Sequence, residues 1–164
     1  MIRIPVVNEK DEIIRYKDRN DRNSTDIIRV SGLWVLNLKG EVLIARRASG
    51  KIRDGGKWGP SAAGTVEEGE TYLSNILKEA KEEIGLKINE GDLMPDSRHY
   101  YVETSHKFFC RIYFIKLDLP ISFFKTGDEV SEVKWVNIDE LKKWFEDSPQ
   151  DFISSFKPAL STLS

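Results

Sequence analysis

The sequence has few of the features that direct a protein to membranes or to secretion. It contains one cysteine, Cys110, so no disulfide can form within the chain. Its apolar stretches are far too short to span a bilayer, and its N-terminus lacks the basic and apolar regions of a signal or transit peptide. These absences favour a reducing compartment, and we expect a cytoplasmic protein without a membrane partner. Cys110 lies inside the apolar run FFCRIYFIKL and is expected to be buried.

The sequence also lacks an excess of positive charge. Its 25 Lys and Arg residues face 27 Asp and Glu residues, which gives a formal net charge of −2. Proteins that bind long phosphate polymers usually carry a basic surface, so we do not expect a nucleic-acid polymer as a partner. The chain has 164 residues, 40% of them apolar, which fits one soluble domain that covers residues 1–164.

Apolar runs separated by turn residues predict several short strands. Residues 1–25 are typical of a small N-terminal hairpin followed by a linker. Residues 27–38 and 41–47 are apolar runs on either side of a turn, and they predict an antiparallel pair of strands. The Gly- and Ser-rich residues 48–64 are expected to form a loop.

The second half of the chain continues this pattern. Residues 98–102, 108–117 and 132–136 predict three further strands. Residues 137–145 have the capping residue and apolar spacing of a helix, and residues 148–163 are expected to add a short helix and a tail.

A helix is predicted between residues 70 and 84, where apolar residues recur at i, i+3, i+4, i+7 and i+11. Gly85 is expected to end it. Three carboxylates, from Glu79, Glu82 and Glu83, share another face of this helix. Like charges at these spacings repel one another, and each raises the cost of ionising the others.

A carboxylate cluster of this kind becomes favourable when a hard divalent cation joins it and supplies positive charge. Mg²⁺ keeps part of its water shell and prefers one or two carboxylates together with substrate phosphates. The alternative is a solvated face of a glutamate-rich helix. The spacing of the glycines and glutamates around the helix favours the metal site.

Residues 64–86 read GTVEEGETYLSNILKEAKEEIGL and resemble the box of the Nudix family. That pattern is G, five residues, E, seven residues, R, E, aliphatic, any, E, E, any, G, aliphatic. The matching residues are Gly64, Glu70, Glu79, Ala80, Glu82, Glu83, Gly85 and Leu86. Lys78 departs from the pattern because the family has arginine there. A lysine cannot grip two carboxylate oxygens as a guanidinium does, although at i, i+4 it is able to pair with Glu82.

The resemblance implies an α/β/α sandwich with a mixed sheet, and hydrolysis of a diphosphate linked to a further group. It also implies bound Mg²⁺, for which Mn²⁺ often substitutes. The metal-site residues that it implies are Gly64, Glu70, Glu79, Glu82 and Glu83. Among these, Glu70 is expected to support the cluster, and Gly64 to offer its carbonyl oxygen.

The base that takes a proton from the attacking water is left open. Its candidates are Glu82 and Glu83 from the box and Glu129 from the later loop, with Glu132 as a further alternative. Lys78 is assigned a role in orienting the glutamates.

Two arginines resemble the basic residues with which the family meets substrate phosphates. These are Arg46 and Arg47, at the end of a predicted strand, although each alone is also typical of a protein surface. Trp34 and Trp58 are candidates for stacking on a ring of the substrate, or for packing in the core.

The two histidines, His99 and His106, are isolated in the sequence and are expected to be structural or solvent-facing.

The rest of the chain resembles the branch of the family that contains isopentenyl diphosphate isomerases and their hydrolase-like relatives. Those isomerases carry a catalytic cysteine in the segment that here reads KWGPSAAG, and no cysteine stands there. Isomerase activity is therefore not expected.

The preferred hypothesis is a metal-dependent pyrophosphohydrolase that acts on a nucleoside diphosphate derivative or a nucleotide. The alternative is a non-catalytic module that binds a nucleotide or metabolite. The group attached to the diphosphate stays open, and because family members are often dimers, a homodimer is one expectation.

Overall fold

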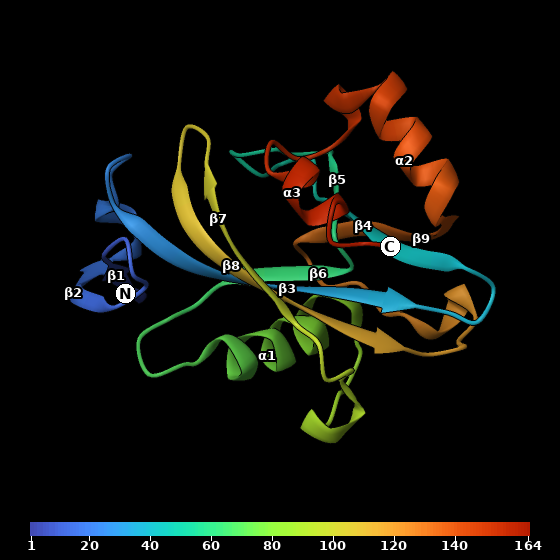
Figure 1. The fold of residues 1–164 in the computed structure, drawn as a ribbon, viewed down its shortest axis with the longest axis horizontal. Helices are drawn as coiled ribbons and strands as arrows, with labels where there is room; N and C mark the ends of the chain where they lie inside the picture. The colour runs from blue at the N-terminus through green and yellow to red at the C-terminus, as the bar shows by residue number, and fades with distance from the viewer.

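A long strand, β3 (Ile27–Leu36), lies at the centre of the sheet in the computed structural model, which describes residues 1–164 (Figure 1). It pairs antiparallel with β1 (Arg3–Val7) and with β6 (Ala62–Thr65). It pairs in parallel with β8 (Lys107–Lys116) over ten consecutive residues. The sheet is therefore mixed, as expected.

The other strands extend this sheet through antiparallel pairs. They are β2 (Ile13–Asp18) beside β1, β7 (Arg98–Glu103) beside β8, and β5 (Trp58–Gly59) and β9 (Val130–Asn137), both beside β4 (Glu41–Arg47). Strands β7, β8 and β9 confirm the three strands predicted in the second half of the chain, to within two residues at each end.

The expected antiparallel pair of residues 27–38 and 41–47 is correct only beside the turn. Leu36 and Val42 are the one register pair that β3 and β4 share. Beyond it the strands diverge, because β3 is apolar on both faces and fits a parallel neighbour inside the protein. The loop expected over residues 48–64 is also interrupted by β5 and β6.

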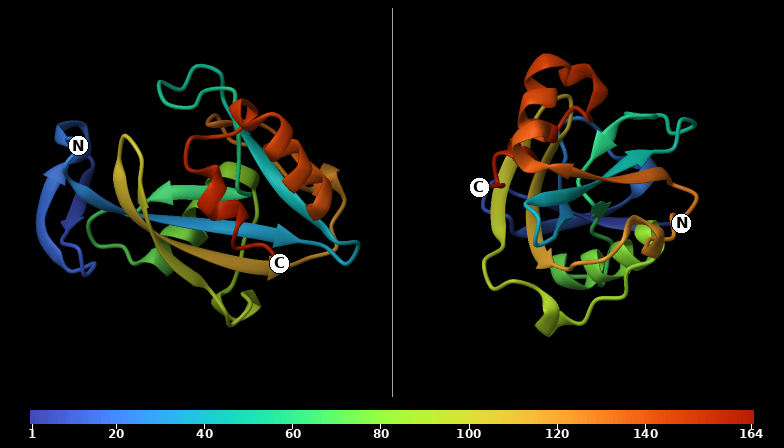
Figure 2. Two further views of the ribbon diagram at one scale, coloured as in Figure 1. Left: turned by 45° about the horizontal axis from the view of Figure 1, so that its top comes forward. Right: turned by 90° about the vertical axis from the view of Figure 1, so that its right-hand side faces the viewer.

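Helices cover both faces of the sheet (Figures 1 and 2). Helix α1 (Tyr72–Ile84) lies on one face, and α2 (Ile138–Asp147) and α3 (Phe156–Leu160) lie on the other. This arrangement confirms the α/β/α sandwich. None of the helices has both the length and the apolar composition that crossing a bilayer requires.

Alternate residues of β3 and β4 point to opposite faces and build two cores. Leu33 and Leu43 belong to the core under α1, whereas Trp34 and Ile44 belong to the core under α2 and α3. Cys110 lies in the second of these cores, which confirms that it is buried.

Trp34 is a packing residue. Its side chain is fully buried, and its indole Nε1 donates to the carbonyl oxygen of Ala159 at 3.2 Å. The position leaves no face of the ring open to a ligand.

Helix α1 begins and ends at specific capping residues. The Thr71 hydroxyl accepts from the amide of Ser74 at 3.0 Å, and the Ser74 hydroxyl accepts from the amide of Thr71 at 2.9 Å. Together they form a capping box, which starts the helix two residues later than the apolar pattern predicts. Gly85 ends it with φ of +68°, as expected of a C-terminal glycine.

The N-terminal hairpin β1–β2 is tied to the body of the protein through its turn. There the carboxylate of Asp11 accepts from Arg29 Nε and from the Tyr72 hydroxyl, both at 2.7 Å. His99 Nε2 lies 3.0 Å from the same carboxylate, and its ring stacks on Phe109. His99 is therefore part of a structural network, as expected.

Candidate functional site

Three carboxylates meet where the C-terminal half of α1 faces the segment before β9. Glu79, Glu83 and Glu129 each contribute an oxygen atom, and these oxygens lie within 4.8 Å of one another. Glu79 is buried, Glu83 is half-buried and Glu129 is exposed. We call these three residues the carboxylate cluster.

Two close backbone approaches hold the carboxylate cluster together. The amide of Gly127 donates to the carbonyl oxygen of Glu83 at 3.1 Å, and a Cβ at position 127 would overlap the backbone of Glu82. On the opposite side, a Cβ at Gly64 would overlap the side chain of Glu79. Only glycine permits either approach, so the first glycine of the box is needed for room beside Glu79.

The carboxylate cluster holds more negative charge than its surroundings balance. Burial raises the pKa of Glu79, and the charges of Glu82 and Glu129 raise it further. Burial, and then the charge of Glu79, raises the pKa of Glu83 well above its ordinary value. The amide of Ala63, which donates to Glu83 Oε1 at 3.0 Å, only partly offsets this.

The third member of the cluster, Glu129, has a cation beside it. Lys51 Nζ lies 2.7 Å from Glu129 Oε1, and this contact lowers the pKa of Glu129. The sequence does not point to Lys51, because it lies in a Gly- and Ser-rich loop far from Glu129 along the chain.

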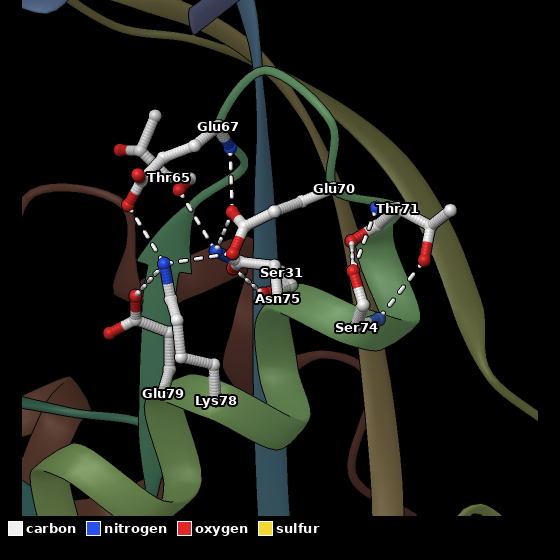
Figure 3. A network of polar contacts seen from close by, with 9 residues as sticks. All are labelled: Ser31, Thr65, Glu67, Glu70, Thr71, Ser74, Asn75, Lys78 and Glu79. Carbon is white, nitrogen blue, oxygen red and sulfur yellow. Dashed lines mark hydrogen bonds and ion pairs between the residues drawn. The ribbon is translucent and has the colours of Figure 1, made fainter. Parts of the chain in front are cut away.

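Lys78 binds the loop before α1 and not the next turn of the helix (Figure 3). Its Nζ lies 2.8 Å from Glu67 Oε2 and 2.8 Å from Glu70 Oε2. The expected pairing with Glu82 is wrong, because a helical side chain points back toward the N-terminus of its helix. Burial alone would lower the pKa of Lys78, but its bonds to the two glutamates raise it.

Glu70 does not belong to the carboxylate cluster and is separated from it by Lys78. Its Oε1 accepts from the amide of Glu67 at 2.8 Å and from Asn75 Nδ2 at 3.0 Å, and its Oε2 faces Lys78 (Figure 3). Lys78 Nζ is in turn 3.8 Å from Glu79 Oε1. Glu70 therefore contacts the cluster through Lys78, which agrees with a supporting position.

Asn75 is a buried residue of α1 that the box pattern does not specify. Its amide nitrogen also donates to the carbonyl oxygen of Thr65 at 3.0 Å, and its amide oxygen accepts from the Ser31 hydroxyl. It connects α1 to β3 and β6 beside the cluster. Asn75 is fully buried, and its burial requires the hydrogen bonds that it makes. The sequence alone does not reveal this role, because the box pattern leaves position 75 unspecified.

The other glutamates expected at the site lie outside the carboxylate cluster. Glu82 is exposed on α1 and is absent from the group of converging oxygens. Glu132 pairs with Arg46 Nη1 at 3.1 Å on the surface. Of the candidate bases, Glu83 and Glu129 are thus the two that face the other members of the cluster.

The structure separates the two arginines that the sequence places together. Successive residues of β4 point to opposite faces of the sheet. Arg47 lines a small cavity of about 50 Å³ together with Glu83 and Glu129. Arg46 lines a separate cavity of about 470 Å³ together with Trp58.

Trp58 packs beside the larger cavity. Its ring meets Trp144 edge-on at a centroid distance of 6.0 Å, and the Arg46 guanidinium lies 5.8 Å from its centroid. Trp58 is buried and does not line the smaller cavity beside the carboxylate cluster.

His106 lies in the turn between β7 and β8, where its Nδ1 is 3.4 Å from Arg53 Nη2.

The donor set of the carboxylate cluster fits a hard divalent cation. All of its side-chain donors are carboxylate oxygens, which Mg²⁺ and Mn²⁺ prefer over soft ligands. The raised pKa values of Glu79 and Glu83 mark charge that a cation would neutralise. Arg47 lines the small cavity beside Glu83 and Glu129, so a positive charge lies next to the carboxylates.

Comparisons with known proteins identify the family of the chain. The NUDIX domain family model matches residues 27–156. The chain is 26% identical to the uncharacterized Nudix hydrolase PA4841 of Pseudomonas aeruginosa over 76% of this chain and 78% of that protein. It is 25% identical to the isopentenyl-diphosphate Delta-isomerase of Enterobacter sp. over 90% of this chain and 82% of the isomerase.

Among solved structures, the fold is similar to that of DR0079 from Deinococcus radiodurans. The two superpose with a TM-score of 0.81 over 98% of each chain, at 22% sequence identity. That similarity includes the N-terminal hairpin, which lies outside the match to the family model. With the matched domain, its box and the fold in agreement, the chain belongs to the Nudix family and is a hydrolase of phosphorus-containing anhydrides.

Proposed function

We propose that the protein is a metal-dependent pyrophosphohydrolase that cleaves the diphosphate linkage of a nucleoside diphosphate derivative or a nucleotide. The observation that supports this most directly is the convergence of Glu79, Glu83 and Glu129 beside a cavity that also holds Arg47. The carboxylate cluster suits a divalent cation, and the arginine suits a phosphate group.

Glu79, Glu83 and Glu129 are the residues proposed to hold Mg²⁺ or Mn²⁺, with Glu82 at the exposed edge. A bound divalent cation would neutralise charge on the phosphates and lower the pKa of a water molecule. The carbonyl oxygen of Gly64 is a further candidate ligand, since this glycine contacts the side chain of Glu79.

Other residues keep these carboxylates in place. The amide of Ala63 fixes one oxygen of Glu83 by donating a hydrogen bond to it. Lys78, held by Glu67 and Glu70, sets the position of Glu79 from the opposite side. These contacts limit the movement of the carboxylates before a substrate arrives.

In the proposed reaction one water molecule attacks phosphorus, the bridging P–O bond of the diphosphate breaks, and two phosphate-bearing products leave. The proton of the water passes to a carboxylate of Glu83 or Glu129. Arg47 is proposed to contact a phosphate oxygen, because it is the arginine that lines the same cavity.

A substitution of Glu83 by Gln tests the proposal. Glu83→Gln keeps the acceptor of the Ala63 amide but removes the charge. Release of phosphate or pyrophosphate from a panel of nucleotides and nucleotide sugars, with Mg²⁺ or Mn²⁺, should fall by at least about a hundredfold, the size of a general base or ligand effect. Turnover as fast as in the wild type would reject the proposed function.

A matched control for this experiment is Glu146→Gln. Glu146 is exposed on α2, on the opposite side of the sheet, and makes no side-chain contact. It should retain the activity of the wild type, which separates loss of the cluster from a general effect of charge.

A further inference from the structure

Four arginines lie in the segments between the carboxylate cluster and the turn that joins β7 to β8. Arg19 and Arg22 follow β2, Arg47 ends β4, and Arg53 lies in the loop between β4 and β5. We call these four residues the arginine rim. None of them forms an ion pair with a carboxylate, in contrast to the lysines Lys17, Lys51 and Lys78.

The arginine rim leads outward from the cavity by a series of contacts. Arg47 lines the cavity, and its Nε donates to the carbonyl oxygen of Arg53 at 3.0 Å. Arg53 Nη2 lies 3.4 Å from His106 Nδ1, in the turn between β7 and β8. Arg22 Nη2 donates to the carbonyl oxygen of Lys107, the first residue of β8, at 3.4 Å. In Figures 1 and 2 the loop after β4 reaches toward this turn.

Arg22 is the arginine of the rim whose hydrogen-bonding capacity the protein leaves partly unused. Its Nε is buried and has no hydrogen-bond partner. Burial, and then the charge of Arg53, lowers the pKa of Arg22 to about 10. A buried guanidinium nitrogen without a partner is unfavourable, and a second cation nearby adds to the cost.

The carboxylates closest to the arginine rim are engaged elsewhere. Asp26 accepts from Lys17 Nζ at 2.7 Å, Asp54 accepts from the Ser154 hydroxyl at 3.2 Å, and Glu129 accepts from Lys51. The positive charge of the rim is therefore only partly balanced by the protein.

The charge of Arg19 acts on the same region. It contributes to the lowered pKa values of Arg22 and Arg53, and also to that of Glu129 in the carboxylate cluster. Arg19 therefore connects the N-terminal segment to the site electrostatically. The charges of Arg19 and Arg47 in the rim both act on Glu129 of the cluster.

We infer that the arginine rim binds phosphate groups that extend beyond the cleaved linkage, so that the preferred substrate carries a chain of three or more phosphates. Guanidinium groups bind phosphate oxygens through paired hydrogen bonds. A diphosphate at the carboxylate cluster would reach Arg47, whereas Arg22 and Arg53 lie farther out along the series of contacts. This inference rests on the proposed function and narrows its substrate class.

Nucleoside triphosphates, dinucleoside polyphosphates and inorganic tripolyphosphate share this chemistry, so the test compares them. The kcat/KM of the wild type with Mn²⁺ is measured for a nucleoside diphosphate, the matching triphosphate and a dinucleoside tetraphosphate. The triphosphate or tetraphosphate should be preferred over the diphosphate by about tenfold, the factor of one charge-assisted hydrogen bond. A preference for the diphosphate would overturn the inference.

Two single variants test whether the arginine rim causes the preference for the triphosphate. Arg22→Gln and Arg53→Gln should each lower the ratio of triphosphate to diphosphate kcat/KM severalfold, and a double variant should abolish it. Arg98→Gln, an exposed arginine of β7 without side-chain contacts, is the control and should keep the ratio. If both rim variants also keep the ratio, the inference is wrong.

Binding to the metal-free protein separates this inference from the proposed function. Calorimetry with inorganic tripolyphosphate and pyrophosphate should show tighter binding of tripolyphosphate, weakened by Arg22→Gln and by Arg53→Gln. That result would support the rim even if no nucleotide were hydrolysed, in which case the proposed function alone would fail. Equal losses for the two anions would reject the inference whatever the enzyme hydrolyses.

Discussion

Lys51 Nζ and Glu129 Oε1 lie 2.7 Å apart, so a lysine from the loop after β4 contacts one member of the carboxylate cluster. If Glu129 binds a metal ion as proposed, Lys51 would compete with that ion for the carboxylate. The contact connects the loop after β4 to the segment before β9. It makes the charge state of the cluster depend on a residue outside the Nudix box.

Replacement of Lys51 by Met should strengthen metal binding. Exposed ion pairs are worth about 0.2–1 kcal/mol, so the Kd for Mn²⁺ in the absence of substrate should fall by a factor of about 1.4 to 5. Calorimetric titration with Mn²⁺ measures this directly. Lys39→Met, at the turn between β3 and β4, is a matched control without side-chain contacts. Weaker binding in Lys51→Met than in this control would contradict the competition.

Local patterns in the sequence predict the parts of the site that are local. The apolar spacing and Gly85 define α1, and the box places Glu79 and Glu83 one turn apart on it. The fold class also follows from the box, since a family pattern of this specificity carries its fold with it. These features depend on residues within a few turns of one another.

The remainder of the site depends on contacts between distant segments. Arg46 and Arg47 are adjacent in sequence, but which of them faces the cluster depends on the register of β4 with β9, including an irregularity beside Arg47. Lys51 reaches Glu129 only because loops from two strands meet. A single sequence contains no periodic signal for such contacts, and the same reason explains why the parallel pairing of β3 with β8 was not predicted.

Glu83→Gln should stabilise the metal-free protein at neutral and alkaline pH. The pKa of Glu83 is raised in the folded state, so wild-type stability falls as pH rises from the unfolded pKa of about 4.3 toward the folded one. Gln carries no charge at any pH and avoids this loss. The gain should be on the order of 1 kcal/mol or more at pH 8, about 2–4 °C in unfolding temperature.

Measuring the unfolding temperatures of both proteins at pH 4 is the control, because the stabilising effect of Glu83→Gln should disappear at that pH. There Glu83 is protonated in the folded state and mostly protonated in the unfolded state, so the variant and wild type should unfold within about 1 °C of each other. Adding Mn²⁺ at pH 8 should reverse the order, because only the wild type keeps all three carboxylates. A variant less stable than the wild type at pH 8 without metal would show that the carboxylate is already balanced.

Lys78→Met should destabilise the fold around the start of α1. It leaves Glu67 and Glu70 without their cation, and an unpaired charged partner costs about 1–3 kcal/mol of unfolding free energy. Chemical denaturation of the metal-free protein measures the loss. Lys81→Met, an exposed lysine on the same helix, should stay within about 0.5 kcal/mol of the wild type.

Lys78→Arg restores the residue of the family pattern and should behave in the opposite way. A guanidinium offers enough donors to hold Glu67 and Glu70 while it binds Glu79 more directly. Stability should stay close to that of the wild type, and kcat/KM should rise severalfold as Glu79 becomes better positioned. A loss of activity in this variant would mean that the loop of Glu67 has adapted to lysine.

Gly64→Ala should remove metal binding while it leaves most of the fold intact. A Cβ at position 64 would overlap the side chain of Glu79, which must then turn away from Glu83 and Glu129. Stability should fall by about 1–3 kcal/mol, as expected for overpacking, and the Kd for Mn²⁺ should rise at least about tenfold. Gly91→Ala is the control, since a Cβ there meets no atom within 4 Å and the backbone does not require glycine. Metal binding as tight as in this control would mean that Glu79 reaches the ion from a different position, and the role of the first box glycine would then have to lie in its backbone carbonyl.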